Sequence, residues 1–292
     1  MGAQGKNMQT LPIFFAAEMV ADSGSYSPSA EKPAQVVRRF LQTGLPVRLE
    51  RPEPLSVDTL SLAHERQFVT DVLEGRRGNG FGNRSAEVAA SLCWTNGAML
   101  SAASAALKSG TVACAPCSGF HHAHWDRAGG FCTFNGLMIT AQALRQAGKV
   151  HRVGILDFDM HYGDGTDSIL SKLGIDWVTH ITAGRFYDQP DQAHEFLDRI
   201  PEWMSTLSDC DLILYQAGAD PHVDDPLGGF LTTEQLFQRD RLVFQHAHRQ
   251  RTPIVWNLAG GYQKTPSGGI EPVLDIHENT LRACIEAFGV GQ

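Results

Sequence analysis

Long apolar runs are missing from this 292-residue sequence. A membrane-spanning helix requires roughly 18 or more consecutive apolar residues, and no stretch of the chain reaches that length. The opening residues, MGAQGKNMQT, also lack the apolar segment of a secretory signal peptide. We therefore expect a soluble, cytoplasmic protein with no membrane partner.

Positive charge is scarce. The chain has 24 Lys and Arg against 32 Asp and Glu, which gives a formal net charge of −8. A nucleic-acid-binding surface needs a concentration of basic side chains. The charge balance argues against a direct nucleic-acid partner and is compatible with a cationic substrate.

Cysteines are few and scattered, six in all, which is not the pattern of a disulfide framework. Cys114 and Cys117 do form a C-x-x-C motif, which can be redox-active or half of a zinc site. No second pair follows at the spacing of a zinc ribbon. We therefore favour the interpretation that these cysteines are small side chains packed in a strand.

Internal repeats, low-complexity tracts and long linkers are absent as well, so we predict one catalytic domain spanning residues 1–292. Two stretches rich in Gly, Ser, Pro and Asn, residues 23–33 and 76–85, are typical of surface loops. Binding residues often lie in such loops.

From residue 110 onward, short apolar segments alternate with amphipathic ones, which is typical of parallel strands and the helices between them. The strands are expected at residues 111–117, 152–159, 177–182, 211–218 and 252–261. Helices are expected at residues 33–44, 86–110, 136–148 and 166–174. The pattern predicts a three-layer α/β/α fold with a mostly parallel sheet, whose ligands bind at the carboxyl ends of the strands.

Polar side chains follow several of these strands. Asp157, Asp159 and His161 end one of them and would share a face in an extended chain, because side chains alternate along a strand. Other strands lead to Asp220, to Tyr262 and, through a short loop, to the pair 121–122, which is His-His. All of these groups can converge on one edge of the sheet.

An Asp-x-His motif with a distant Asp offers one nitrogen and two oxygens, and it leaves a position open for water, as a catalytic divalent site requires. A bound cation would also explain carboxylates in an apolar sheet. Taken singly, Asp220 could be a helix cap or turn residue, the two histidines could be core or surface residues, and Tyr262 could be an ordinary amphipathic side chain. Their joint placement favours the metal site.

Four motifs carry a family resemblance: SGFHHAHWDRAGGFCTFN, DFDMHYGDGT, QAGADPHVDDPLGGF and LAGGYQK. In this order and spacing they resemble the zinc-dependent histone deacetylases of the arginase and deacetylase superfamily. Residues 239–264 are most similar to the class IV branch. The resemblance extends from about Gly119 to Phe288, and the first hundred residues match only loosely. The paired S-x-D-x-D arrangement of two-manganese arginases is missing, so one metal ion is expected.

The resemblance implies a role for each motif residue. Asp159, His161 and Asp220 would hold the ion, zinc or alternatively iron. His121 and His122 would act on the attacking water. The residues expected to support them are the orienting carboxylates and the hydroxyl donor to the substrate carbonyl, namely Asp157, Asp164 and Tyr262.

The resemblance also implies a narrow apolar tunnel for the acylated side chain, with Leu227 at its rim. The tunnel residues would be Gly130, Phe131 and Phe186, although the segment GRFYDQP around Phe186 departs from the family pattern. A potassium ion is a further candidate cofactor. Its ligands would come from Asp157, Asp159, His161, Thr179 and His180.

The leading functional hypothesis is a zinc amidohydrolase that removes acetyl or longer fatty acyl groups from N-acyl-lysine in peptides or proteins. Leu227 stands where polyamine deacetylases can carry an acidic residue, which favours acyl-lysine. The alternative substrate is a small acylated amine such as an acetylated polyamine, if loops 23–33 and 76–85 narrow the entrance. A non-catalytic acyl-lysine binding module is the third hypothesis, but it would be expected to have lost a ligand or the tyrosine.

Overall fold

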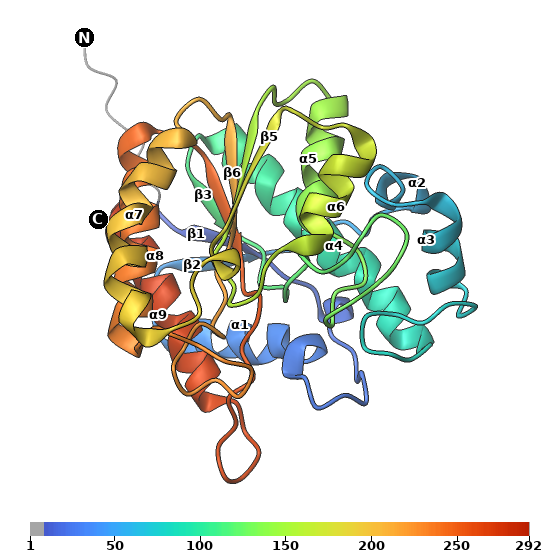
Figure 1. The fold of residues 1–292 in the computed structure, drawn as a ribbon, viewed down its shortest axis with the longest axis horizontal. Coiled ribbons are helices and arrows are strands. Elements are labelled where there is room, and N and C mark those ends of the chain that lie inside the picture. Colours follow the sequence, from blue (N-terminus) through green and yellow to red (C-terminus); the bar gives the residue numbers. More distant parts are fainter. Residues whose placement is uncertain (1–8, 292) are drawn as a thin grey trace.

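A wholly parallel sheet of seven strands forms the centre of the computed structural model, which describes residues 9–291 (Figure 1). Its strand order is β2-β1-β3-β7-β6-β4-β5. The start of the chain, where no signal peptide is expected, lies outside the described residues. The strands are β1 (Leu11–Phe14), β2 (Val47–Glu50), β3 (Val112–Cys114), β4 (Val153–Asp157), β5 (Val178–Thr182), β6 (Leu212–Gln216) and β7 (Ile254–Asn257).

Helices cover both faces of the sheet (Figure 1). One layer consists of α1 (Lys32–Gln42), α7 (Ala193–Thr206), α8 (Thr233–Gln250) and α9 (Glu271–Phe288). The other consists of α2 (Val57–Leu60), α3 (Arg66–Leu73), α4 (Ala86–Ser109), α5 (Gly136–Gln146) and α6 (Asp164–Leu173). Each layer has its own cluster of buried apolar side chains. The predicted α/β/α architecture is therefore confirmed.

The predicted long helix of residues 86–110 shows how local sequence signals set the element boundaries. Ser85 caps the amino end of α4 by accepting a hydrogen bond from the Val88 N–H. Gly110 ends the helix in the left-handed conformation, with φ of 70°. Strands β4 and β6 are buried at every position, as parallel strands covered on both faces must be.

Two strands, β1 and β2, come from the first 50 residues, outside the part of the chain in which strands were predicted. β1 has only four residues, and β2 is a partly exposed edge strand with the mixed sequence VRLE. Segments this short carry no readable alternation. A second difference is that β4 ends at Asp157, so the shared-face argument was wrong beyond that residue: Asp159 and His161 project from the following loop.

Strand β3 also ends early, at Cys114, so Cys117 lies beyond it. Both thiols are buried and unpaired in disulfides, and burial raises the pKa of each. These observations agree with the structural interpretation of the C-x-x-C motif.

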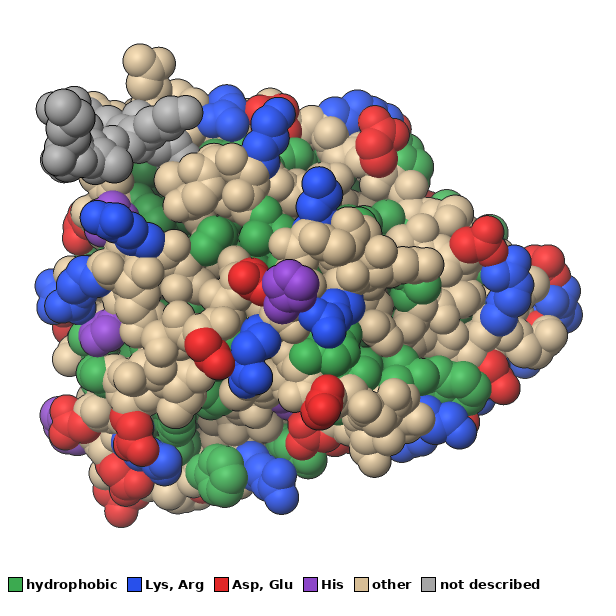
Figure 2. Space-filling view, turned by 90° about the horizontal axis from the view of Figure 1, so that it is seen from above, with side chains coloured by type: hydrophobic (Ala, Val, Ile, Leu, Met, Phe, Trp, Pro, Cys, Tyr) green, Lys and Arg blue, Asp and Glu red, His purple; other side chains and the backbone are tan. Residues whose placement is uncertain are grey.

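The surface seen from above has acidic and basic side chains interspersed with apolar ones (Figure 2). Neither sign of charge forms a continuous patch on the described part of that face. Within residues 9–291, no helix has the length and apolar character needed to cross a membrane.

Candidate active site

Loops from four neighbouring strands meet at the carboxyl edge of the sheet. Strands β3, β7, β6 and β4 are consecutive in the sheet, so the loops that follow them adjoin. These loops carry, in that order, the histidine pair 121–122, Tyr262, Asp220, and Asp159 with His161. Parallel topology thus brings together side chains that are up to 141 positions apart.

Asp159, His161 and Asp220 form a group whose ligand atoms all lie within 4.8 Å of one another. His161 Nδ1 is 3.2 Å from Asp159 Oδ1 and 3.2 Å from Asp220 Oδ2. Backbone amides orient both carboxylates: the Gly260 N–H donates to Asp159 Oδ2 at 2.8 Å, and the Met160 N–H donates to Asp220 Oδ1 at 3.2 Å.

The electrostatics of this group favour a cation. Burial and the adjacent Asp159 carboxylate raise the pKa of Asp220 to about 7. Hydrogen bonds from its ring to the Asp159 and Asp220 carboxylates raise the pKa of His161 to about 11. Two carboxylates held together away from water need a positive charge between them. One imidazole nitrogen and two carboxylate oxygens therefore fit the expected divalent ion.

His121 is fully buried against a carboxylate. Its Nδ1 lies 2.8 Å from Asp157 Oδ2, and Asp157 is fixed in turn by the Gln216 amide, which donates to Oδ1 at 2.9 Å. Burial opposes a charge on the ring, but the nearby Asp157 and Asp159 carboxylates outweigh it and raise the pKa of His121 to about 9. These carboxylates therefore favour the protonated form of His121.

The pKa of His122 is shifted in the opposite direction from that of His121. His122 Nδ1 lies 2.7 Å from Asp164 Oδ1, and its ring centroid lies 4.0 Å from that of His121. Burial and the positive charge of His121 lower the pKa of His122 below its ordinary value.

His124, which sequence reasoning missed, also approaches the Asp164 carboxylate, with Nε2 3.3 Å from Asp164 Oδ2.

A pocket adjoins these groups, and its lining includes some of the predicted site residues, among them His121, Asp159 and Tyr262. Gly130 has φ of +49°, and a Cβ at this position would lie 2.4 Å from His122 Cδ2, so only glycine fits. Phe131 also has a positive φ, 62°, and its N–H donates to the Gly80 carbonyl of loop 76–85 at 3.1 Å. The pocket is lined by Ser29, Gly119, His121, Gly130, Phe131, Cys132, Asp159, Gly260 and Tyr262.

Tyr26, on loop 23–33, is a rim residue that sequence reasoning missed. Its ring centroid lies 5.4 Å from that of Phe131 and 6.5 Å from that of Tyr262, and the residue is 57% exposed. Loop 76–85 braces loop 23–33, because the Asn83 side-chain amide donates to the Ser23 carbonyl at 2.7 Å. Both glycine- and serine-rich loops therefore contribute to this entrance.

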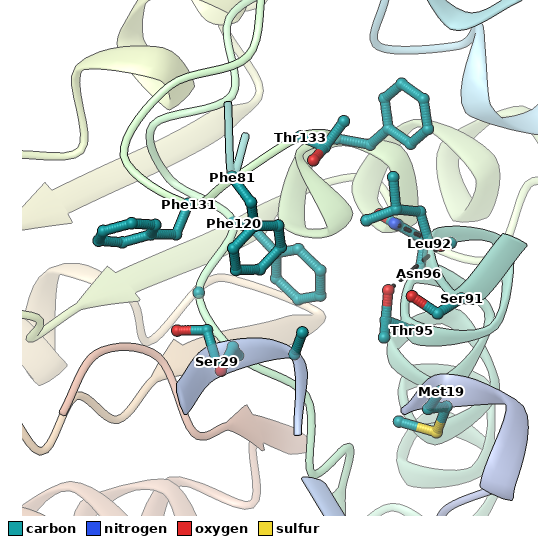
Figure 3. A pocket seen from close by; sticks show the side chains of 14 residues that line it. Met19, Ser29, Phe81, Ser91, Leu92, Thr95, Asn96, Phe120, Phe131 and Thr133 are labelled. Carbon is teal, nitrogen blue, oxygen red and sulfur yellow. Dashed lines mark hydrogen bonds between the residues drawn. The ribbon is translucent and has the colours of Figure 1, made fainter. Parts of the chain in front are cut away.

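A second, largely apolar pocket adjoins the first and shares Ser29, Gly119 and Phe131 with it. Figure 3 shows phenylalanines on one side of this adjoining pocket and polar and apolar side chains of α4 on the other. Its remaining lining residues are Met19, Ala30, Phe81, Ser91, Leu92, Thr95, Asn96, Ser118, Phe120, Thr133 and Phe134.

The remaining predicted tunnel residue, Phe186, and the predicted rim residue, Leu227, are exposed. Phe186 is 61% exposed, lies beside the Arg185 guanidinium, and is not among the residues lining either pocket. Leu227 is 37% exposed, and its N–H donates to Asp225 Oδ1 at 3.0 Å. The second oxygen of Asp225 accepts the Tyr262 N–H at 2.8 Å, so this carboxylate ties the Leu227 turn to the tyrosine loop.

Of the candidate potassium ligands on β5, Thr179 pairs with Gly154, away from the carboxyl end of β4, whereas His180 approaches Asp157. Thr179 and His180 lie on β5 beside β4. The buried His180 ring is hydrogen-bonded to Asp167 through Nδ1, at 2.7 Å, and its Nε2 lies 3.8 Å from Asp157 Oδ2. The potassium site stays a prediction.

Lys32, at the start of α1, is a buried cation that no sequence signal indicated. Its Nζ donates to the carbonyls of Ala259 and Gly260, in the loop that carries Tyr262. Burial lowers the pKa of Lys32 to about 8, although nearby carboxylates, Asp220 first among them, favour its charged form. Ala259 has an unusual φ of 49°, so this contact holds a strained turn in place.

The sequence of this chain is similar to those of known deacetylases. A model of the histone deacetylase domain matches residues 28–183 and 185–270. Histone deacetylase 2 of Arabidopsis thaliana is 29% identical over 184 residues, which are 56% of this chain and 47% of that protein. A probable deacetylase of Methanothermobacter thermautotrophicus is 27% identical over 267 residues, with 80% of each protein covered.

The fold is similar to that of the acetylpolyamine aminohydrolase from Burkholderia pseudomallei, with a TM-score of 0.73 at 20% identity. The alignment covers 95% of this chain and 99% of that one, and at such an identity it shows the shared fold alone. The domain match, in contrast, spans most of the sequence. It shows that this chain belongs to the histone deacetylase family.

Proposed function

We propose that this protein is a zinc-dependent amidohydrolase that removes acyl groups from N-acyl-lysine in peptides or proteins. One observation carries the proposal: Asp159, His121 and Tyr262 line one pocket, the other two residues of the metal-binding group adjoin Asp159, and His122 adjoins His121. A non-catalytic binding module would have no need to keep the metal-binding group, the histidine pair with opposite pKa shifts and the tyrosine together.

The metal ligands, the two histidines and Tyr262 would have different roles in amide hydrolysis. When bound by Asp159, His161 and Asp220, zinc would supply a Lewis acid that polarises the amide carbonyl and makes water more acidic. His122, whose lowered pKa keeps it neutral, would accept the proton of the water and pass it to the leaving amine. The cationic His121 would stabilise negative charge, and Tyr262 would donate its hydroxyl hydrogen bond to the carbonyl oxygen.

The entrance favours an acylated lysine over a polycation. The aromatic rings of Tyr26 and Phe131 adjoin there, and the exposed Leu227 would add an apolar side chain to the rim. These side chains suit the aliphatic stem of lysine. The adjoining pocket would receive an acyl chain longer than acetyl, as the class IV likeness of residues 239–264 suggests. An acetylated polyamine is the second candidate substrate, because the fold is also that of an acetylpolyamine aminohydrolase.

The decisive experiment measures release of acyl groups from acetyl to myristoyl from one lysine peptide, alongside an acetylated polyamine, with zinc-loaded protein. We expect cleavage of the peptide series. Its chain-length optimum would separate a deacetylase from a fatty deacylase. Cleavage of the polyamine alone would select the second candidate, and cleavage of neither by zinc-replete protein would contradict the proposal.

The pH dependence of kcat/KM should report His122. A general base works only when neutral, so activity is expected to be retained at neutral pH and to fall as pH drops through the His122 pKa. That pKa lies below the ordinary value of about 6.5, and a bound cation would lower it further. A rate profile measured between roughly pH 5 and 9 checks this. An acidic limb centred above the ordinary histidine value would assign the titration to another group.

Replacement of Tyr26 with alanine should weaken substrate binding with little effect on the chemical step. Loss of its aromatic contacts with the rim is expected to raise KM by roughly 2- to 10-fold at unchanged kcat. Leu41→Ala, a similarly exposed apolar residue on α1, is the control. Equal KM values for Tyr26→Ala and the wild type would show that the Tyr26 side chain does not contribute to substrate binding.

A further inference from the structure

Arg239, on α8, lies fully buried behind the metal-binding group and contacts both loops that carry its carboxylates. Its Nη1 donates to the Phe158 carbonyl at 3.1 Å and to the Gly218 carbonyl at 2.7 Å. Phe158 directly precedes Asp159, and Gly218 stands two residues before Asp220. One nitrogen therefore joins the backbones of both carboxylate ligands.

The guanidinium is itself held rigidly. Arg239 Nε donates to Asp240 Oδ1 at 2.8 Å, and Asp240 also accepts hydrogen bonds from the Tyr215 hydroxyl of β6 and the Thr280 hydroxyl of α9. The planar fork of arginine can bond a carboxylate and two carbonyls at once, with its orientation fixed. Strand β6, helix α8 and helix α9 thus together determine where the Nη1 atom lies.

A buried ion pair is a poor way to gain stability alone, because desolvation offsets much of its attraction and apolar side chains often replace such pairs without loss. A role in fixing the distance between the loops that carry Asp159 and Asp220 would explain why the buried Arg239–Asp240 pair is present. A divalent ion demands ligand atoms at defined distances, and groups behind the ligands commonly determine its affinity.

We propose that Arg239 is a positioning residue that fixes the separation of Asp159 and Asp220 and thereby raises the affinity of the site for its divalent ion. The inference rests on the proposed metal site. It concerns this chain's own hydrogen bonds, so it can be tested by metal binding without any substrate.

The test compares Arg239→Met, which keeps the aliphatic stem and removes every donor, with the conservative Arg239→Lys. Zn²⁺ affinity is measured by competition with a fluorescent chelator, and the Co²⁺-loaded proteins are compared by absorption spectroscopy. We expect Arg239→Met to bind Zn²⁺ about 10- to 100-fold more weakly. Arg239→Lys should be intermediate, with an altered Co²⁺ spectrum, because an ammonium lacks the rigid fork.

Tyr187→Phe is the matched control. It removes the hydrogen bond of another buried hydroxyl, to Glu195, outside the contacts of Arg239 and Asp240, so we expect at most a lower melting temperature with unchanged Zn²⁺ affinity. Wild-type Zn²⁺ affinity and Co²⁺ spectrum in Arg239→Lys would overturn the inference, even if Arg239→Met does not fold. A wild-type chain that binds no Zn²⁺ would overturn the proposed metal site, and this inference with it.

Discussion

Asp220→Ala is expected to lose both bound Zn²⁺ and detectable deacylation. Asp220 supplies one of three ligands, and its buried carboxylate lies 3.2 Å from His161 Nδ1. With it removed, the remaining aspartate and histidine cannot complete a site in which an open position is left for catalysis. Metal content per chain and acyl release from a lysine peptide, measured on the same preparation, check the prediction.

The control for this variant lies four residues away. Asp224 is 79% exposed at its side chain and belongs to the same connection after β6, so Asp224→Ala changes the same net charge without touching the metal-binding group. It should keep wild-type zinc content and turnover. Stoichiometric zinc in Asp220→Ala, or full activity in its absence, would mean that the carboxylate is not a ligand.

Much of the site followed from one rule about parallel sheets. Asp157, Asp220 and Tyr262 were expected to meet because each follows an apolar strand, and the carboxyl ends of parallel strands share an edge. The structure brings them together. The rule requires only that the strands exist. The prediction that these residues meet was therefore unaffected by errors in strand ends, such as the prediction that β4 runs past Asp157.

The residues that sequence reasoning missed support the site from elsewhere in the chain. Lys32 bonds the carbonyl of Ala259, 227 residues away, and Arg239 bonds that of Phe158, 81 residues away. In sequence, Lys32 falls in the predicted loop 23–33 and Arg239 in a segment with no predicted helix, and a lysine or arginine normally faces water. The position of Tyr26 beside the pocket could not be predicted for another reason. A surface loop has no periodicity from which the direction of a side chain can be inferred.

Tyr262→Phe is expected to lower kcat by about 10²- to 10³-fold, the usual loss when one oxyanion donor is removed, with KM little changed. Phenylalanine preserves the ring that packs 5.7 Å from Phe131, and the backbone N–H bond to Asp225 does not involve the hydroxyl. Burial, followed by the charges of Asp220 and Asp159, raises the pKa of Tyr262. The hydroxyl therefore stays protonated and able to donate at any working pH.

Two comparisons isolate the role of this hydroxyl. Tyr187→Phe makes the same change at another buried tyrosine, whose hydroxyl bonds Glu195 away from the site, and should leave kcat intact. Zinc content should be normal in Tyr262→Phe, because the hydroxyl is not one of the three ligands. Low turnover with full metal occupancy would separate loss of the hydrogen bond from loss of the ion, which Asp220→Ala produces. Wild-type turnover in Tyr262→Phe would instead leave the histidine pair and the metal as the only groups acting on the carbonyl.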